Sequence, residues 1–375
     1  MGKNKNHPDY ILFLTVGILI VLGIVILASV SAPLSQEKFG NTYYFLKHQL
    51  LFALIPGIIL AFLAFKINLA LLRKWAPILL LINLVLLVMV FLPVIGSKLE
   101  GAARWIRLGP FSLQPSELLK LTFIIYLAAW LSSRTEKITL NQKIGNFNQF
   151  SQTFIAFMVA IGVISSLLIL QPDISTLATI VLVAALMYFL ANTPLWHSFL
   201  IILIGAGGLF TLIKLAPYRA ARFLVFLNPE VDPLGIGYQA KQALITVGSG
   251  GIFGAGLGAN IEKPLWFLPQ TISDSIFAIF SEETGFIGSS ILIFLFLMFL
   301  WRGFKIGKEN PDRFSQLTAL GITSWIIIQT FVNIGAMIGI LPLTGIPLPF
   351  ISYGGSALIT ELIGVGILLN ISRNT

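Results

Sequence analysis

The chain is divided into long apolar stretches, each long enough to cross a lipid bilayer as a helix. About 20 mostly apolar residues suffice for a helical span, and backbone groups in lipid must be hydrogen-bonded within the segment, which favours helices. Charged residues make up only 10% of the chain, whereas a soluble domain carries roughly 25%. The sequence therefore predicts an all-α polytopic membrane protein, with residues 1–375 as one transmembrane domain. We expect ten spans, at residues 10–32, 46–66, 76–96, 116–133, 152–170, 173–192, 195–216, 274–301, 314–340 and 354–371.

The distribution of basic residues predicts the orientation of these spans. Lys3 and Lys5 precede the first span, whose apolar stretch is too long for a signal peptide, so we expect a retained helix. Placing the N-terminus inside puts most of the Lys and Arg residues, including Arg73, Lys74 and Lys143, in the cytoplasm. With ten spans, both termini then lie in the cytoplasm.

Composition excludes several other classes of site. The net charge of +9 has no basic tail to present to nucleic acid, so anionic lipid headgroups are the expected counterpart. The chain has no cysteine, which excludes disulfides and thiolate metal sites. His7, His48 and His197 show no metal-ligand spacing.

The predicted outer connections differ from ordinary solvated loops. Residues 101–110, the long stretch 216–273 and residues 341–356 mix Gly, Pro, aromatic and apolar residues. Irregular backbone at membrane depth must be buried in protein or line a cavity. We therefore expect these segments to fold against the helices, and any function to lie on the outer face.

The start of the fourth span carries charge into an apolar helix. Pro115, Ser116 and Glu117 are typical of a helix N-terminus. Lys120 follows three residues later on the same face, where it can pair with Glu117. A lysine inside a span needs such a partner or a water-filled cleft, so this segment is either a well-formed helix start or part of a functional cleft. Asp173, after Pro172, is expected to start a helix.

Arginines in two outer loops admit two interpretations. Arg104 and Arg107 flank Trp105, as in an interfacial anchor, but the guanidinium fork also suits phosphate. Arg219 and Arg222 share a face if their segment is helical. That face would suit either lipid headgroups or the headgroup of a lipid substrate.

Asp274 stands where the long outer loop meets the eighth span, and spacing alone allows two roles. It can cap the helix, as Ser273 also can, or act as a catalytic base. Glu282 and Glu283, further along the span, are expected to make structural contacts. The glycine-rich residues 248–258 lack the strand–helix unit of a nucleotide-binding fingerprint, so tight backbone packing or flexibility is expected there.

Four ordered segments together resemble the SEDS family (FtsW, RodA and SpoVE) over nearly the whole chain. They are GAARWIRLGPFSLQPSELLK, FLNPEVDPLGIGYQAKQALITVGSGGIFGAGLG, SDSIFAIFSEETGFIG and LPLTGIPLPFISYGGS. Residues 43–49 and the run ARFLVFLNP are more similar to the FtsW branch than to the RodA branch.

The resemblance implies a glycosyltransferase that polymerises lipid II at the outer face of the bacterial cytoplasmic membrane, with Asp274 as the essential acid. It places Glu117 and Lys120 near a central cavity. Family members usually have Thr-Asp-Phe-Ile-Phe around the acid, whereas this chain has Ser-Asp-Ser-Ile-Phe, with Gln270 near a second expected acid. An inverting displacement is expected, in which Lys120, Arg104, Arg219 and Arg222 stabilise the leaving diphosphate.

The resemblance also supplies further binding and structural candidates. Gln239 and Lys241 join the expected substrate-binding residues. The structural positions that match the family motifs are Pro115, Ser116, Pro347, Pro349, Ser352, Tyr353, Gly354 and Gly355.

The family pairs with a class B penicillin-binding transpeptidase and other divisome or elongasome membrane proteins, and Mg²⁺ or another divalent cation is a candidate cofactor. A lipid II flippase and a non-catalytic division scaffold remain the alternative functions.

Overall fold

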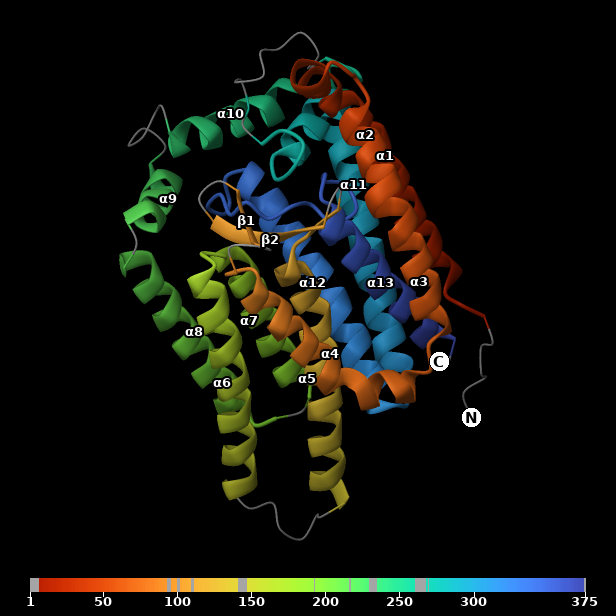
Figure 1. Ribbon diagram of the computed structural model, residues 1–375, viewed down its shortest axis with the longest axis vertical. Helices are drawn as coiled ribbons and strands as arrows, with labels where there is room; N and C mark the ends of the chain where they lie inside the picture. Colours follow the sequence, from red (N-terminus) through yellow and green to blue (C-terminus); the bar gives the residue numbers. More distant parts are fainter. Residues whose placement is uncertain are drawn as a thin grey trace.

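The computed structural model describes residues 7–92, 96–99, 102–108, 111–140, 147–191, 193–215, 217–228, 235–259, 268 and 270–373. These residues form a bundle of long helices, with short surface helices and a small sheet at one end (Figure 1). In chain order the elements are α1 (Tyr10–Phe39), α2 (Tyr44–Gln49), the π-helix η1 (Leu50–Leu54), α3 (Ile55–Lys66), α4 (Leu69–Met89), β1 (Gly96–Leu99), β2 (Ala102–Leu108), β3 (Phe111–Leu113), α5 (Pro115–Leu140), α6 (Phe147–Leu170), α7 (Ile174–Leu190), α8 (Leu195–Leu215), α9 (Pro217–Leu227), α10 (Ile236–Ser249), α11 (Ile276–Glu309), α12 (Arg313–Met337) and α13 (Gly355–Ser372).

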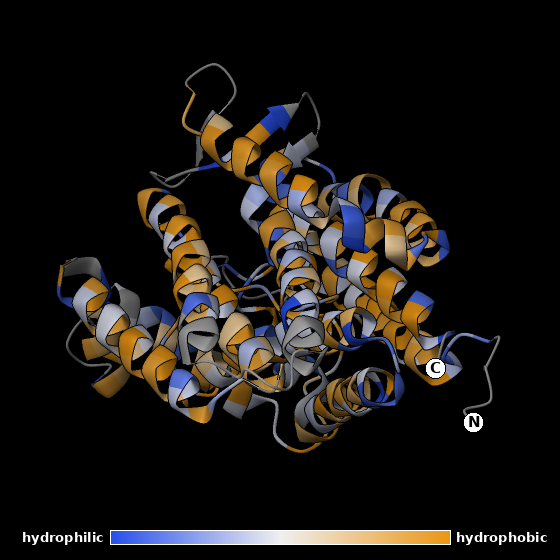
Figure 2. Cartoon of the chain, turned by 90° about the horizontal axis from the view of Figure 1, so that it is seen from below, coloured by the Kyte–Doolittle hydropathy of each residue, from blue (hydrophilic) through white to orange (hydrophobic). Residues whose placement is uncertain are grey.

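The helices confirm a polytopic membrane protein. Within the described residues, nine helical stretches are long and apolar enough to cross a membrane, one of them being α2, η1 and α3 together. The sixth predicted span corresponds to α7, a shorter apolar helix of 17 residues. Figure 2 shows hydrophobic residues along the long helices. Together these elements account for the ten predicted spans.

Several predicted spans have boundaries that differ from those of the helices, and α5 and α11 continue to Leu140 and Glu309 instead of ending near 133 and 301. The third, predicted at 76–96, is α4, which begins after Asn68, whose side chain accepts from the N–H of Ala70 at 2.9 Å. The chain stays apolar through Val90 to Leu92 after α4 ends, so hydropathy displaced the prediction. The first span continues to Phe39 and ends at Gly40, which adopts a left-handed conformation (φ 64°).

The connection between α4 and α5 is a small sheet and not the predicted irregular loop. Its three antiparallel strands are ordered β1-β2-β3. Side chains alternate along β2, with Ile106 buried and Arg107 exposed, as expected for one covered sheet face. The protein is therefore nearly, but not entirely, helical.

The centre of the bundle is formed by α5, α12 and α13. In the apolar 18-residue stretch of α12, and in that of α13, 78% of the residues are buried. The corresponding share in α8, which lies at the periphery, is 6%. The α13 helix packs against α3, and α11 packs against α12. Trp325 of α12 is fully buried. Most polar residues of α12 and α13 are therefore buried away from both lipid and water.

The predicted long outer connection contains two helices, α9 and α10. Figure 1 shows them at the same end of the bundle as the sheet and the start of α11, with both chain termini away from that end. We call this end the α9/α10 face. Residues 229–234 and 260–267 of this connection lie outside the described residues, as do Lys3, Lys5 and Lys143, which entered the prediction of orientation.

The α11 helix is broken at Gly285 (φ 69°, ψ −166°), where the glycine-rich segment after α10 fills the break. The N–H groups of Ala255 and Gly256 donate to the carbonyls of Glu282 and Glu283, at 2.8 and 3.1 Å. A Cβ on Gly254 would lie 2.3 Å from the carbonyl oxygen of Glu283. Of the two expectations for this segment, these contacts support tight backbone packing.

Candidate functional site

The predicted pairing of Glu117 and Lys120 is confirmed. Lys120 Nζ lies 2.7 Å from Glu117 Oε2, and the two side chains are only 3% and 6% exposed. Pro115 is the first residue of α5, as its sequence position predicts. The Oγ of Ser116 donates to Asp173 at 2.9 Å, and Asp173 is the N-cap of α7, so its predicted role at a helix start is also confirmed.

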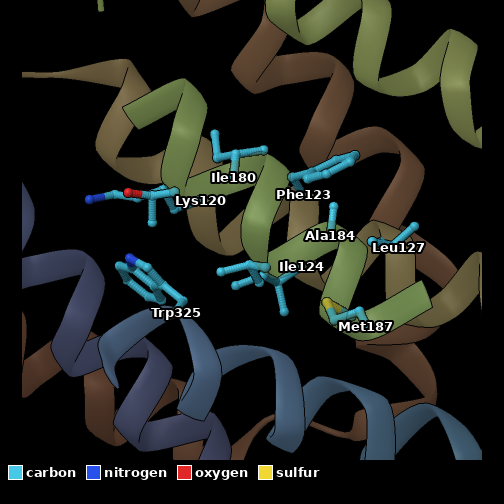
Figure 3. A pocket seen from close by; sticks show the side chains of 10 residues that line it. Lys120, Phe123, Ile124, Leu127, Ile180, Ala184, Met187 and Trp325 are labelled. Atoms are coloured by element: carbon cyan, nitrogen blue, oxygen red, sulfur yellow. The ribbon is translucent and has the colours of Figure 1, made fainter. Parts of the chain in front are cut away.

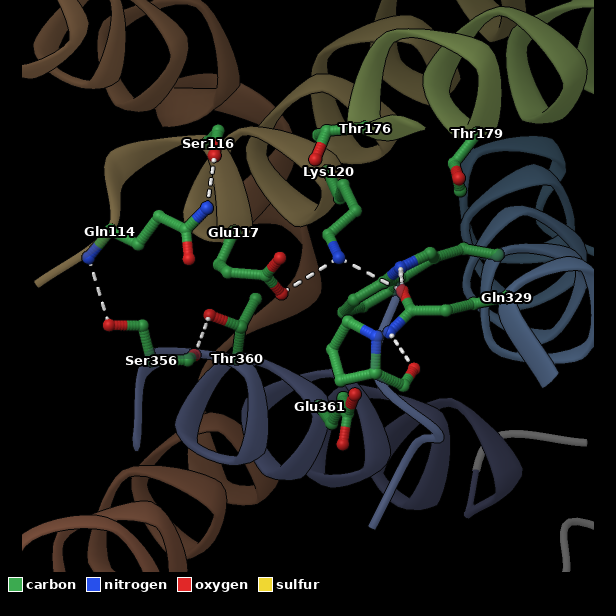
Figure 4. Close-up of polar contacts among 12 residues, drawn as sticks. Gln114, Ser116, Glu117, Lys120, Thr176, Thr179, Gln329, Ser356, Thr360 and Glu361 are labelled. Atoms are coloured by element: carbon green, nitrogen blue, oxygen red, sulfur yellow. Dashed lines mark hydrogen bonds and ion pairs between the residues drawn. The ribbon is translucent and has the colours of Figure 1, made fainter. Parts of the chain in front are cut away.

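Lys120 also reaches across the bundle to α12. Its ammonium donates to Oε1 of Gln329 at 2.9 Å, and the same oxygen accepts from the indole N–H of Trp325 at 2.9 Å (Figure 4). The ammonium lies 5.4 Å from the centre of the Trp325 ring, within cation–π range. A carboxylate, an amide and an aromatic face therefore offset the burial of this charge.

A pocket lies between α5, α7 and α12. Phe123, Ile124 and Met187 contribute to its apolar wall, and Lys120 and Trp325 also line it. Figure 3 shows Lys120 and Trp325 at one end, with the ammonium directed away from Leu127 and Met187. Apolar side chains thus flank the polar cluster on the side away from Glu117.

Asp274 does not cap α11. It lies in a turn before the helix, whose N-cap is Ser275 without a side-chain capping bond. The residue is 9% exposed, and its Oδ1 accepts from the hydroxyl of Ser273 at 3.1 Å. A Cβ added to Gly345 would lie 3.8 Å from Oδ2. The carboxylate is therefore held between its own turn and the loop that precedes α13.

Hydrogen bonds to main-chain carbonyls connect the Asp274 turn to this loop and to α12. Asn333 of α12 donates through Nδ2 to the carbonyl of Asp274 and to that of Ile346, each at 2.7 Å. Ser352 Oγ donates to the carbonyl of Ser273 at 2.5 Å, and the N–H of Tyr353 donates to Ile272 at 2.8 Å. Two segments about 70 residues apart in sequence thus form one unit around the carboxylate.

The other structural residues predicted in this loop have identifiable packing roles. The carbonyl of Pro347 accepts from Nε2 of Gln329 at 3.0 Å, and Pro349 is buried. The N–H of Gly354 donates to Gln49 at 3.3 Å, and Gly355 is the first residue of α13.

Tyr353 forms a hydrogen bond between its hydroxyl and Nδ1 of His48, with a separation of 3.0 Å. Burial raises the pKa of the Tyr353 phenol to about 12, and the nearby Tyr44 adds to the rise. The phenol therefore stays protonated near neutral pH.

The predicted phosphate-binding arginines have main-chain partners in the structure. Arg104 donates to the carbonyls of Gln171 and Pro172, so it ties β2 to the turn between α6 and α7. Arg107 is exposed. These contacts give Arg104 a structural role in the structure as it stands.

Arg219 and Arg222 do lie on one helix, α9, as their spacing suggested. Arg219 donates to the carbonyl of Leu212 at 3.1 Å, and Arg222 donates to that of Leu343 at 3.2 Å. Leu343 belongs to the loop that contacts Asp274. Arg222 is therefore the arginine connected to the candidate site by a described contact.

The remaining candidates lie around the start of α11. Gln239 donates to the hydroxyl of Ser275, next to Asp274, at 3.3 Å, and Lys241 is exposed. Glu282 accepts from Ser249 at 2.8 Å. Glu283 accepts from Ser29 at 2.7 Å and from the N–H of Gly258 at 3.0 Å. Both glutamates therefore make structural contacts of the expected kind.

Three buried polar residues of this region were missed from the sequence. They are Gln329 and Asn333 of α12 and Glu361 of α13, which are 0%, 1% and 2% exposed. Glu361 accepts from the N–H of Phe350 at 2.9 Å and lies beside the Lys120 cluster in Figure 4. The available signal was their occurrence inside apolar spans, where polar residues are costly and mark functional or packing sites.

The described residues contain no group of three or more His, Cys, Asp or Glu side chains placed to hold a metal ion. Mg²⁺ often binds through one or two carboxylates together with substrate phosphates. A single carboxylate such as Asp274 fits this kind of Mg²⁺ site, in which phosphate supplies the other ligands.

The sequence matches a known protein family over nearly its whole length. The model of the FtsW/RodA/SpoVE family, described as "Cell cycle protein", matches residues 9–375. Stage V sporulation protein E of Bacillus subtilis (strain 168) is 40% identical, covering 100% of this chain and 99% of its own length. The probable peptidoglycan glycosyltransferase FtsW of Trichlorobacter lovleyi is also 40% identical, covering 97% and 93% of the two chains.

Solved structures show the same fold. A chain from a structure entitled "Structural coordination of polymerization and crosslinking by a peptidoglycan synthase complex" superposes with a TM-score of 0.78 at 28% identity, covering 98% of each chain. The rod shape determining protein RodA of Thermus thermophilus superposes with a TM-score of 0.70 at 27% identity, covering 98% and 97%. Since the family model and these relatives cover almost the whole length, the chain belongs to the FtsW/RodA/SpoVE family.

Proposed function

We propose that this chain is a peptidoglycan glycosyltransferase that polymerises lipid II into glycan strands. The observation that carries the proposal is the placement of Asp274. The residue is mostly buried at the α9/α10 face, its carboxylate accepts from Ser273, and its main-chain carbonyl accepts from Asn333 of α12. The relatives named as probable peptidoglycan glycosyltransferases of the FtsW type support the same assignment.

Asp274 is proposed to act as the general base. The 4-hydroxyl oxygen of a GlcNAc unit attacks the anomeric carbon of MurNAc, and its proton passes to the Asp274 carboxylate. The bond from that carbon to the diphosphate oxygen breaks, and undecaprenyl diphosphate leaves with the electron pair. A positioned base contributes roughly 10²–10⁴-fold. One base and a good leaving group suit a single inverting displacement.

Cations near the site are proposed to stabilise the departing diphosphate. Arg222 is connected to the loop around Asp274, and Lys120 is held in the adjoining polar cluster. Opposite charge placed where negative charge develops lowers the barrier. Arg104, Arg219, Glu117, Gln239 and Lys241 remain candidates for contacts to the substrate headgroup. Mg²⁺, bound by the diphosphate and a carboxylate, would neutralise phosphate charge.

The membrane setting and the partners follow from the same proposal. The α9/α10 face is the outer face of the bacterial cytoplasmic membrane, and both termini lie in the cytoplasm. A class B penicillin-binding transpeptidase is the proposed partner, with other division or elongation proteins in the assembly. The similar chain from a peptidoglycan synthase complex that coordinates polymerisation with crosslinking supports this pairing.

The test is lipid II polymerisation by the purified protein in complex with its transpeptidase, with glycan strands resolved on gels. We expect Asp274→Ala and Asp274→Asn to lose activity by at least about 10²-fold. Asp312→Asn is the matched control, because Asp312 caps α12 and Asn caps equally well. Full polymerisation by Asp274→Ala would refute the assignment of the base. Transbilayer movement of lipid II by a wild type that makes no polymer would favour a flippase.

A further inference from the structure

Two buried amides on α12 lie between the Lys120 cluster and Asp274. Gln329 and Asn333 are four residues apart, so they project from the same face of the helix about 6 Å apart along its axis. They are 0% and 1% exposed. Their partners, the carbonyls of Ile346 and Pro347, belong to adjacent residues of one loop.

Asn333 donates both of its side-chain N–H groups to main-chain carbonyls. One goes to Asp274 and the other to Ile346, each at 2.7 Å. Because both partners only accept, the amide must present its nitrogen to them, which fixes its orientation. A single side chain therefore joins the turn that carries the candidate base to the loop beside it.

Gln329 is oriented by Lys120. Lysine has only donors, so the Gln329 oxygen must face the ammonium, at 2.9 Å, and Nε2 is left to donate to Pro347 at 3.0 Å. Figure 4 shows this sequence of contacts from Glu117 through Lys120 to Gln329. The buried ion pair is thereby connected to the residue next to Ile346.

We propose that Asn333 and Gln329 are positioning residues that fix the Asp274 carboxylate against the loop at residues 345–347. This inference rests on the proposed role of Asp274 as the base. Neither amide contacts the reacting atoms in this proposal. They set the distance and direction from which the carboxylate meets the acceptor hydroxyl, and a misplacement of about 1 Å can cost on the order of 10²-fold in rate.

The first variant is Asn333→Leu, which has a similar shape and no donor. We expect kcat to fall by about 10²-fold with KM for lipid II nearly unchanged, because binding groups remain in place. Hydrogen exchange should accelerate in peptides that cover residues 270–276 and 341–353. Gln329→Met should give a smaller loss of kcat, with faster exchange confined to residues 341–353.

Asn370 provides a matched control. It also donates through Nδ2 to two main-chain carbonyls, those of Ala64 and Ile67, at 3.1 and 2.7 Å. It lies at the end of α13 away from the 341–353 loop. Asn370→Leu should lower the thermal unfolding temperature as much as Asn333→Leu does, yet leave kcat and exchange in residues 270–276 unchanged.

The outcomes separate the possibilities. An unchanged kcat in Asn333→Leu, or an equal loss of kcat in Asn370→Leu, overturns the proposal. If Asn333→Leu does not fold, Asn333→Ser, which keeps one donor, and Gln329→Met carry the same test. An active Asp274→Ala protein would instead refute the role of Asp274 as the base. The exchange data would then show only whether Asn333 and Gln329 hold the turn and the loop together.

Discussion

The ammonium of Lys120 lies 2.7 Å from the carboxylate of Glu117, one turn away on the same helix, in the buried centre of the bundle. Because both partners belong to α5, the pair needs only the helix in order to form. Gln329 and Trp325 then complete the surroundings of the ammonium from α12.

Removing one member of this pair should destabilise the fold. Lys120→Met leaves the Glu117 carboxylate buried without its cation, and breaking a buried pair costs about 3–5 kcal/mol. The double variant with Glu117→Gln and Lys120→Met removes both charges and should recover much of that loss. Unfolding of the detergent-solubilised proteins measures the loss in the single variant and the recovery in the double variant. Equal stability of the single and double variants would contradict this view of the pair.

The glycine-rich segment should tolerate alanine at one position and not at another. Gly254 and Gly256 both have positive φ, 86° and 93°, so alanine brings backbone strain of about 1–3 kcal/mol at each. Only at Gly254 does a Cβ meet backbone, at 2.3 Å, whereas nothing lies within 4 Å at Gly256. Gly254→Ala should therefore unfold at the lower temperature. The difference between the two variants reports the packing against α11.

At the end of the bundle where the termini lie, Asp9 has two roles that can be separated. Its carboxylate accepts from the N–H of Leu12 as the N-cap of α1 and pairs with Arg302 of α11. Asp9→Ser keeps the cap and loses the pair, whereas Asp9→Ala loses both. Thermal unfolding should show the alanine variant as the less stable by about 1 kcal/mol. An identical loss in both variants would show that the cap contributes nothing.

Tyr353 should make stability fall at alkaline pH. Its folded pKa of about 12 lies above the usual tyrosine pKa of 10.0. The contribution of the Tyr353 phenol to the free energy of unfolding is therefore complete below pH 10. It is lost as the pH rises towards 12, because the unfolded chain gives up this proton first. Unfolding measured between pH 9 and pH 12, with Tyr353→Phe for comparison, isolates it. A wild type and a phenylalanine variant with parallel pH dependence would argue against the shifted pKa.

Features set by local sequence were the ones that could be predicted. The spans follow from apolar length, and the Glu117–Lys120 pair follows from helical spacing. The capping role considered for Asp274 was wrong, because the helix begins two residues later than apolarity suggests. The turn before it is held by distant residues, Asn333 and Ser352, which local spacing does not reveal.

The hydrogen-bond partners of the arginines also could not be predicted from local sequence. Arg104 and Arg219 have the right chemistry for phosphate, yet both donate to main-chain carbonyls of neighbouring segments. Which acceptor a guanidinium meets depends on how the helices are placed. Sequence could identify the donors, and only the assembled bundle assigns their partners.

The break in α11 at Gly285 also bears on how the chain is inserted into the membrane. Four of its hydrogen bonds are completed by residues 251–256, which are synthesised before α11 but separated from it in sequence. Left alone in lipid, those backbone groups would be unsatisfied, at several kcal/mol each. The α11 segment must therefore fold together with the glycine-rich segment that precedes it. The half of α11 nearest the α9/α10 face, and with it the neighbourhood of Asp274, takes its final shape only when that earlier segment has docked.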